Sequence, residues 1–591
     1  MIDAILRFAF HWLTRYVLAW LVALAALGLT GDSAWHHFND SRRPSGNSAH
    51  TFIDFGGQWI MGRMVVDGHA WHLYDRAYQW SVAQAYYPIS DEIPEDQRQK
   101  HETGHDANNL MGWLMGSDDP DQTKWRASFV TPLASSSPLD GMVLIVAGQR
   151  QWTPENLAEL EKPCVGGPLY PPISAFVLAP QALLPPPQAY RVRQIVSLAL
   201  ALASALGIAL LARGRVWWPV AVVFVLVYPG FGGNIKLGQN ADLTLTILIW
   251  GWVLIARQHA GWGGIVWGLL AFKPVWAASF LLVLLLTCRW RAAAAMLSSS
   301  ALLIGLTLPF VGLHSWWHWL EIGRKAALLY NVDENWVFLS RDLLGLPRRW
   351  LLDFEVSHTA RDTWPAFYWS WGVYLAALAL TVSVIWFKRR QAQATTGPVA
   401  AFILLGGWLS CYHFMYYDTL LTALPVALLF VEPRRYITPI FVVWHTLSPD
   451  RLPPDWVRYH QARLCDDYPI PPNDLPFDRP PSMWVLNRLI PTWLAVLLFV
   501  EHGLPSFEIA LGFSMTADWL PSVRGVHVFA TDDLLRHRGY RYPWDMFCLI
   551  FLWLWCGLLW LRGQTEIPPA PVEAIDCQEV DIGEGSTETT E

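Results

Sequence analysis

Charged residues are scarce in this chain. Only 15% of its 591 residues are Asp, Glu, Lys or Arg, while 53% are hydrophobic. An average soluble protein carries about 25% charged residues, so the composition excludes a single water-soluble globule of this length. The chain also holds 36 Trp and 41 Pro. Trp is enriched at membrane–water interfaces, and Pro is tolerated better in membrane helices than in soluble ones. The composition therefore predicts a polytopic membrane protein.

Nucleotide-binding motifs are missing as well. The sequence has no P-loop and no Gly-rich dinucleotide fingerprint. The seven Cys form no Cys-x-x-Cys pair, and no Asp-x-Asp-like pair makes a convincing metal site. No basic run suggests nucleic acid as a partner. We expect any chemistry to need neither ATP nor a bound metal, and to use another activated donor.

Long apolar runs are abundant instead. A membrane span needs about twenty residues, and clear runs of about that length lie at 12–30, 194–212, 216–232, 241–256, 292–312, 368–387, 398–417, 485–503 and 546–562. Three further regions are equally apolar but are interrupted by Pro or by charged residues, so their number of passes is ambiguous: 171–187, 261–288 and 420–447. Together they predict an all-α membrane protein with roughly ten to thirteen transmembrane helices.

Basic clusters between the runs predict the orientation, because cytoplasmic loops of membrane proteins are rich in Lys and Arg. Arg7, Arg15 and the cluster at 388–390 are the best cytoplasmic markers. This arrangement would place residues 31–168 outside the cytoplasm. The protein itself would lie in the plasma or inner membrane of the cell. The clusters Arg213/Arg215 and Arg289/Arg291 do not fit simple full spans, so we expect some passes to be broken or re-entrant.

Composition divides the chain into six parts. We expect a first transmembrane helix (1–30), a large extracytoplasmic segment (31–168), a transmembrane core (169–447), a Pro-rich loop (448–484), C-terminal transmembrane helices with an intervening loop (485–563) and an acidic tail (564–591). The tail contains no Lys or Arg and is typical of a disordered end.

A carboxylate stands out in the first external segment. Phe52, Phe55 and Trp59 are spaced three and four apart, which on a helix forms one aromatic stripe. Asp54 and Gln58 share an adjacent face. We predict a helix lying in the membrane interface, with its aromatics in the lipid and Asp54 looking outward. The alternative is that Asp54 is merely solvated.

Two polar patches border the core runs. Tyr170-Pro171-Pro172 leads into an apolar run, where Tyr170 either contributes to a site or simply anchors a kinked helix at the interface. Lys236, Gln239 and Asn240 lie in a polar stretch between two hydrophobic runs. These three side chains are suited to hydrogen-bond a phosphate or sugar hydroxyls, or they belong to an ordinary loop.

Charged side chains also interrupt the apolar runs themselves. Lys273 precedes Pro274 in the middle of the run 261–288. A lysine at membrane depth costs about 3 kcal/mol or more, so it should face a cavity or pair with an anion. Otherwise a hairpin, broken at the proline, carries it out to the interface. His413 and Asp418 lie among tyrosines, which is typical of a sugar platform or of an aromatic belt.

The order of these patches resembles a known family. The phrases that carry the likeness are Asp54, then Gly68 with Leu73-Tyr74-Asp75, Tyr170-Pro171-Pro172, Gly238-Gln239-Asn240 and Lys273-Pro274. Over about residues 10 to 430 the chain resembles the GT-C membrane glycosyltransferases, specifically the polyprenol-phosphate-mannose-dependent enzymes of glycosyltransferase family 87. The external segment 76–168 is long for this pattern.

The resemblance implies a GT-C-like fold and a transfer reaction. A hexose, in this family mannose, would move from a polyprenyl-phosphate-sugar to a glycan or glycolipid acceptor at the extracytoplasmic face. In an inverting transfer, Asp54 would be the general base. Lys273 would bind the phosphate, with Gln58, Gln239 and Asn240 as further contacts. The lipid-linked sugar phosphate would be a co-substrate, and no other cofactor is expected.

Two other classes compete with this hypothesis. A transporter or flippase of lipid-linked sugars would use its intramembrane polar residues, such as Lys273, to line a path, and Asp54 would be incidental. A structural membrane scaffold would leave the polar patches scattered. An enzyme instead needs its base at the mouth of a site beside the external face.

Overall fold

The computed structural model describes residues 12–35, 54–86, 170–212, 216–332, 334–353, 362–430 and 543–562. In these ranges the chain is helical, and its one β-type contact is an isolated bridge between Ser340 and Met415. The all-α prediction is therefore confirmed for the described residues. The predicted Pro-rich loop, the acidic tail, the run 485–503 and most of the external segment lie outside them.

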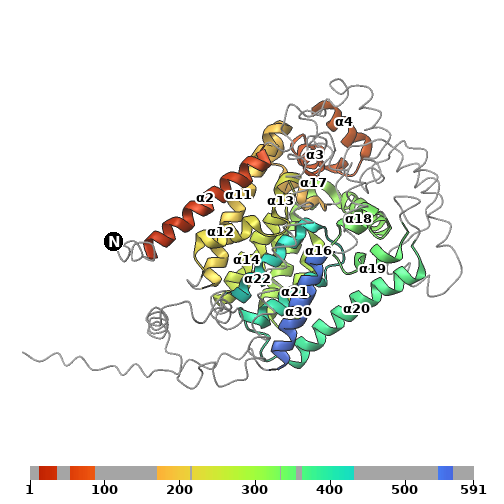
Figure 1. The fold of residues 1–591 in the computed structure, drawn as a ribbon. Helices are drawn as coiled ribbons and strands as arrows, with labels where there is room; N and C mark the ends of the chain where they lie inside the picture. The colour runs from red at the N-terminus through yellow and green to blue at the C-terminus, as the bar shows by residue number, and fades with distance from the viewer. Residues whose placement is uncertain are drawn as a thin grey trace, which may run out of the picture.

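The first helices of the chain are α2 (Trp12–Trp35), α3 (Asp54–Val66), α4 (Arg76–Tyr86), α10 (Pro172–Leu178), α11 (Pro186–Leu211), α12 (Trp218–Val227), α13 (Phe231–Leu237) and α14 (Ala241–Ala256). They are followed by α15 (Ala260–Gly268), α16 (Pro274–Leu286), α17 (Trp290–Leu329), α18 (Glu334–Leu339), α19 (Gly345–Leu351), α20 (Trp364–Phe387), α21 (Gly397–Leu409), α22 (Ala423–Phe430) and α30 (Trp544–Leu561). Short 3-10 helices are η2 (Ala70–His72), η3 (Gln181–Leu183), η4 (Leu269–Phe272) and η5 (Tyr416–Thr422). Figure 1 shows α14, α16, α21 and α22 near the middle of the bundle and α2 along its edge.

Few of these helices are long enough to cross a bilayer. By length and hydropathy the described chain has four candidate spans, in α2, α11, α17 and α20, or five if the bent pair α12 and α13 is counted as one. α14, α15 with η4, α16 and α21 are apolar but shorter. The predicted number of ten to thirteen is therefore not confirmed. Within the described residues the apolar runs do form helices, but several of them break partway.

The run 261–288 shows how such a break arises. α15 and η4 end at Lys273, whose backbone (φ −131°, ψ 77°) leaves the helical region, and Pro274 begins α16. Proline suits a first helical position because its missing N–H has no partner there anyway. Only three residues separate the end of α14 from the start of α15. The carbonyl of Thr287, just past α16, accepts a hydrogen bond from Gln393 (2.6 Å). The two helices thus form a re-entrant hairpin with Lys273 at its tip, as the basic clusters had suggested.

The basic clusters collect at one end of the bundle. Trp252 near the end of α14 donates to the carbonyl of Thr395 (2.9 Å), and Arg289 donates to that of Gln393 (2.9 Å). Trp560 near the end of α30 donates to Gln391 (2.8 Å). We call this region the basic end; its described Lys and Arg residues are Arg257, Arg289, Arg291, Lys388, Arg389, Arg390 and Arg562.

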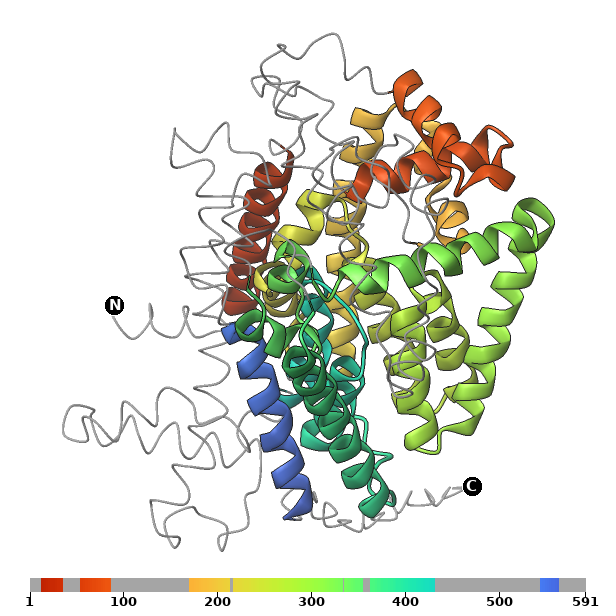
Figure 2. The ribbon, with the colours of Figure 1, turned by 90° about the vertical axis from the view of Figure 1, so that its right-hand side faces the viewer.

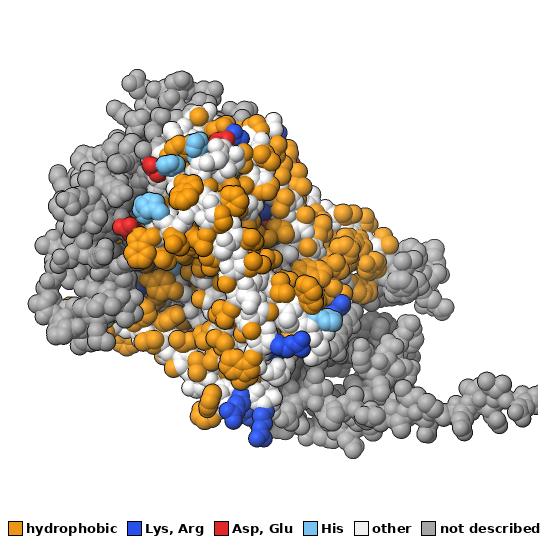
Figure 3. Space-filling model, turned by 180° about the vertical axis from the view of Figure 1, so that it is seen from behind, with side chains coloured by type: hydrophobic (Ala, Val, Ile, Leu, Met, Phe, Trp, Pro, Cys, Tyr) orange, Lys and Arg blue, Asp and Glu red, His pale blue; other side chains and the backbone are white. Residues whose placement is uncertain are grey.

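The opposite end has a different character. Figure 3 shows an apolar band across the molecule, with most of the visible Lys and Arg side chains and one His below it, and the acidic and the other His side chains above it. α3 and α4 lie at this upper end, over the ends of the bundle helices (Figure 2). An apolar band between two polar ends is the surface expected of a protein that sits across a membrane.

Candidate active site

α3 carries the predicted carboxylate, but its aromatic side chains do not face outward. The helix spans Asp54–Val66, as predicted, yet Phe55, Gln58 and Trp59 are all buried. Phe55 packs edge-on against Tyr190 (5.1 Å between ring centroids), and Trp59 donates to the carbonyl of Leu184 (3.1 Å). The prediction that the aromatic stripe faces lipid is therefore wrong. A stripe at helical spacing specifies an apolar partner, and here that partner is the protein itself.

Asp54 is the first residue of α3. The placement of its side chain lies outside what the structure describes, so the prediction that Asp54 is the base stays a prediction. One helical turn further on, the Gln58 amide donates to the carbonyl of Gly238 (3.4 Å). The start of α3 is thereby joined to the loop that precedes α14.

Close packing holds this junction together. Gly238 ends α13 in the left-handed conformation (φ +63°), which L side chains rarely adopt. A Cβ atom at this position would lie 2.7 Å from the Cβ of Phe55. Only glycine allows α3 to approach the loop this closely.

The loop after Gly238 holds two of the predicted binding residues. The Tyr170 hydroxyl donates to Gln239 Oε1 (2.7 Å), and the Tyr74 hydroxyl donates to the Tyr170 carbonyl (2.7 Å). Burial raises the pKa of Tyr74 well above its ordinary value, so this phenol keeps the proton that it donates. Tyr74 therefore contacts Tyr170, and Tyr170 contacts Gln239, although the three residues are far apart in the sequence.

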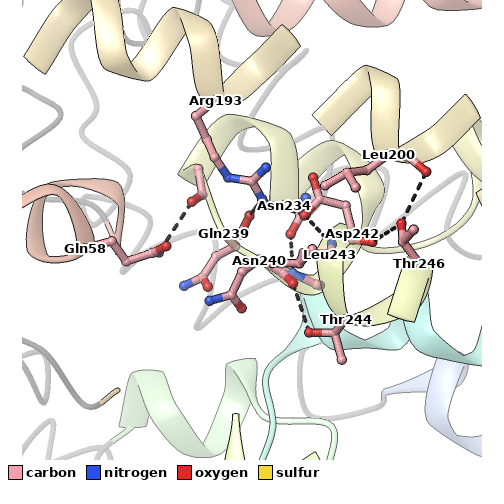
Figure 4. A network of polar contacts seen from close by, with 12 residues as sticks. Gln58, Arg193, Leu200, Asn234, Gln239, Asn240, Asp242, Leu243, Thr244 and Thr246 are labelled. Atoms are coloured by element: carbon pink, nitrogen blue, oxygen red, sulfur yellow. Dashed lines mark hydrogen bonds and ion pairs between the residues drawn. The ribbon is translucent and has the colours of Figure 1, made fainter. Parts of the chain in front are cut away.

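Several amide atoms of this cluster lack partners. Gln58 Oε1, Gln239 Nε2 and Asn240 Oδ1 are buried and have no hydrogen-bond partner among the described residues. Figure 4 shows the amide groups of Gln239 and Asn240 pointing the same way, away from the Arg193–Asp242 pair. A buried polar atom without a partner costs about 1–3 kcal/mol. These atoms are suited to a polar ligand such as a sugar.

A buried ion pair supports the loop from the other side. Arg193 on α11 contacts Asp242 on α14 at 2.5 Å, and the same guanidinium donates to the Gln239 carbonyl. Asn234 Oδ1 accepts from the Ala241 amide (2.7 Å). The sequence analysis missed Arg193 and Asp242. Each is a charge at the border of an apolar run, which is a usable signal, but nothing in the sequence pairs residues 49 positions apart.

Lys273 and Asp418 form a second buried ion pair. Nζ of Lys273 lies 2.7 Å from Oδ1 of Asp418, with Lys273 8% and Asp418 3% exposed, and it lies 5.6 Å from the ring centroid of Tyr417. Lys273 is at the tip of a hairpin, as the alternative proposed, but it is buried against Asp418 and is not exposed at the surface. Both residues were predicted as binding residues, and the structure brings them into contact.

α10 connects the two halves of the site. The Ser174 hydroxyl on α10 donates to the carbonyl of Phe272, next to Lys273 (2.8 Å). Tyr170, just before α10, contacts Gln239. Residues 170–174 therefore touch both the amide cluster, through Tyr170, and the Lys273 turn, through Ser174.

His413 lies in a separate group of polar and aromatic side chains. Its Nδ1 lies 2.9 Å from Asp342 Oδ2, and its ring stacks on Tyr330 (3.6 Å, 14° between planes). Trp336 lies beside it (6.1 Å between centroids), and Nε2 has no partner among the described residues. Asp342 was missed by the sequence analysis. The aromatic surroundings predicted for His413 exist, but Tyr330 and Trp336 form them, while Tyr416 and Tyr417 are buried in the core.

Lys236 lies on α13, two residues before Gly238. It is buried, and its carbonyl accepts a hydrogen bond from the hydroxyl of Tyr190. Lys236 therefore belongs to the same packed region as Gln239, and its predicted contact with a ligand stays a prediction.

The described residues contain no group of three His, Cys, Asp or Glu side chains placed to hold a metal ion. Whether the reaction proceeds without a metal stays a prediction.

Comparison with known proteins bears on the predicted family. No curated protein and no solved structure matches the chain. A model of glycosyltransferase family 87 matches residues 169–436, a range that holds every predicted binding residue except Gln58. The resemblance expected from the sequence is thereby confirmed: over residues 169–436 this chain matches glycosyltransferase family 87.

Proposed function

We propose that this protein is a membrane glycosyltransferase that moves a hexose, mannose in the first instance, from a polyprenyl-phosphate-sugar to a glycan or glycolipid. One observation carries the proposal. Phrases spread over more than 200 positions of the sequence meet in one place, through the contacts Gln58–Gly238, Tyr170–Gln239 and Ser174–Phe272. A structural scaffold would have no reason to gather them.

The phosphate of the donor would lie at Lys273. Transition-state charge on a leaving phosphate is stabilised most by preorganised cations and donors in a site that excludes water. Asp418 holds the Lys273 ammonium in place at 2.7 Å. The unpartnered amide atoms, Gln58 Oε1, Gln239 Nε2 and Asn240 Oδ1, would then contact the hydroxyls of the sugar.

Asp54 would act as the general base. The acceptor hydroxyl attacks the anomeric carbon from the side opposite the phosphate, so the configuration inverts. As the new glycosidic bond forms, the bond from C1 to the phosphate oxygen breaks, and polyprenyl phosphate leaves with the electron pair. The proton of the acceptor hydroxyl passes to the Asp54 carboxylate. A helix N-terminus favours the ionised form of a carboxylate, which is the form that a base needs.

Charge supports an extracytoplasmic site. Positive residues favour the cytoplasmic side of a membrane, so the basic end would be cytoplasmic. α14 starts beside Asn240 and ends at the basic end; its 16 residues make it about 24 Å long. The amide cluster would therefore open toward the opposite face of the plasma or inner membrane.

Radiolabelled donors test this assignment. The purified full chain in lipid nanodiscs would be given polyprenyl-phosphate-mannose, polyprenyl-phosphate-glucose or nucleotide-linked mannose, each with a panel of glycan and glycolipid acceptors. We expect transfer from a lipid-linked donor and none from the nucleotide sugar. Transfer from the nucleotide sugar alone would contradict the proposal. Translocation of the lipid-linked sugar across liposomes without any transfer would favour a flippase.

A further inference from the structure

A cavity of about 390 Å³ lies at the basic end, far from the amide cluster. It is half open and lies between the C-terminal ends of α11 and α14 and the turn that precedes α21. Leu211, Val253 and Ala256 are among the apolar residues that line it. Nothing in the transfer reaction uses this space.

The remaining lining residues are polar. They are Arg257, which is exposed, and Thr395 and Thr396, which are half-buried. The backbone of the turn is held by the hydrogen bond from Trp252 to the Thr395 carbonyl. The cavity therefore joins an apolar wall to a cation and two hydroxyl groups, a combination that matches an amphiphile with an anionic head.

Within the described stretches that carry most of the basic end, the charged side chains have a single sign. The sequence contains no Asp or Glu in residues 243–320 or 363–417, the stretches that carry most of the basic end. Arg289, which packs over the ring of Trp252 (5.1 Å), and the cluster at 388–390 lie in the same region. An anion at Arg257 would meet no described acidic side chain in these stretches.

We propose that this cavity binds one anionic phospholipid of the cytoplasmic leaflet. Its headgroup phosphate would contact the Arg257 guanidinium and the threonine hydroxyls, and an acyl chain would follow Leu211 and Val253. Basic pockets between membrane helices on this side recognise anionic lipid head groups by the same chemistry. The bound lipid would connect α11, α14 and the turn before α21, and so stabilise the fold.

The test compares thermal unfolding in nanodiscs of phosphatidylcholine with and without phosphatidylglycerol. We expect phosphatidylglycerol to raise the Tm of the full chain, and Arg257→Gln to remove at least half of that rise. Arg562→Gln is the matched control: it removes an exposed charge from the basic end without lining the cavity, so the rise should persist.

Two further measurements distinguish lipid binding in the cavity from nonspecific attraction of anionic lipids to the basic end. Ala256→Leu fills the cavity and leaves every charge in place, so it should also reduce the rise. Its Tm in phosphatidylcholine shows whether the variant folds; if it does not, Arg257→Gln decides. The proposal is overturned if phosphatidylglycerol does not raise the Tm of wild type, or if Arg257→Gln or folded Ala256→Leu keeps the full increase in Tm. It is also overturned if inorganic phosphate, added to nanodiscs of phosphatidylcholine, produces the same increase.

Discussion

Lys273 is the residue whose role changes most between sequence and structure. A lysine inside an apolar run is visible in any reading of the sequence, and so is an aspartate inside another. Their pairing is not, because 145 positions separate them and no local pattern links the two. The structure turns two costly isolated charges into one buried ion pair, whose partners depend on each other.

Removing one partner should therefore be severe. Lys273→Met leaves the Asp418 carboxylate buried without its cation, and breaking a buried pair in this way typically costs about 3–5 kcal/mol. We expect a clear fall in Tm and a drop in transfer of about 100-fold, the size seen when a preorganised stabilising group is lost. Thermal unfolding and initial rates on the same preparation would measure both.

A double variant separates stability from activity. Lys273→Met with Asp418→Leu removes both charges, and replacing a buried pair with apolar side chains is often neutral or stabilising. We expect the Tm to recover most of its loss while transfer stays low. Recovery of transfer together with stability would show that Lys273 has a structural role only.

The contact between Asp342 and His413 leads to a second prediction about single residues. The hydrogen bond to Nδ1 fixes the ring orientation and the tautomer of His413, which leaves Nε2 available to a ligand. Asp342→Asn should lower transfer by about 10-fold or more, since a small misplacement of a contacting group can cost up to about 100-fold. Asp67→Asn, in a more exposed ion pair with Arg63, is the control and should transfer normally. Equal rates for both variants would count against a role for His413.

At the scale of elements, the sequence located helices better than it identified their surroundings. The spacing of Phe55 and Trp59 predicted α3 correctly but placed its apolar stripe in lipid. Lipid and protein interior are equally apolar, so periodicity cannot distinguish them; only the close approach of Gly238 to Phe55 reveals which one is present. The contacts of Tyr170 with Gln239 and of Ser174 with the Lys273 turn were likewise not predictable, because they depend on the folding of distant segments.

The junction of α3 with the Gly238 loop can be tested by one methyl group. Gly238→Ala places a Cβ 2.7 Å from that of Phe55 and keeps a positive φ that alanine disfavours. Overpacking of this kind costs about 1–3 kcal/mol. We expect a lower Tm and a loss of transfer, because α3 carries Asp54.

Gly261→Ala on α15 is the matched control for this substitution. A Cβ there meets nothing within 4 Å, and alanine favours a helix over glycine. Its Tm should be unchanged or higher. A Tm for Gly238→Ala equal to that of wild type would contradict the close packing described here.

At the scale of the whole molecule, the all-α fold follows from composition and run length, whereas the number of passes does not. Each pass was predicted from an apolar run of near-spanning length, yet Lys273 breaks one run into a hairpin and α14 has only 16 residues. The basic cluster Arg289/Arg291, which did not fit simple full spans, lies at the basic end once the hairpin is in place. Re-entrant helices preserve the hydropathy of a span while changing its connectivity, so hydropathy alone does not determine the number of passes.

Single-cysteine labelling tests this arrangement. In a background with all seven cysteines replaced, His69→Cys and Arg390→Cys place exposed thiols at opposite ends. We expect a membrane-impermeant maleimide to label His69→Cys in intact cells, and Arg390→Cys only after permeabilisation. Labelling of both without permeabilisation, or of Arg390→Cys alone, would contradict the proposed orientation.

The most direct test of the central claim is transfer by Asp54→Asn. The variant keeps the size and shape of the side chain but cannot accept the proton of the acceptor hydroxyl. With purified protein, a polyprenyl-phosphate-hexose donor and an acceptor used by wild type, we predict a fall in kcat of at least about 100-fold, with donor affinity within a few-fold of wild type. Undiminished transfer by Asp54→Asn would contradict the assignment of this residue as the base.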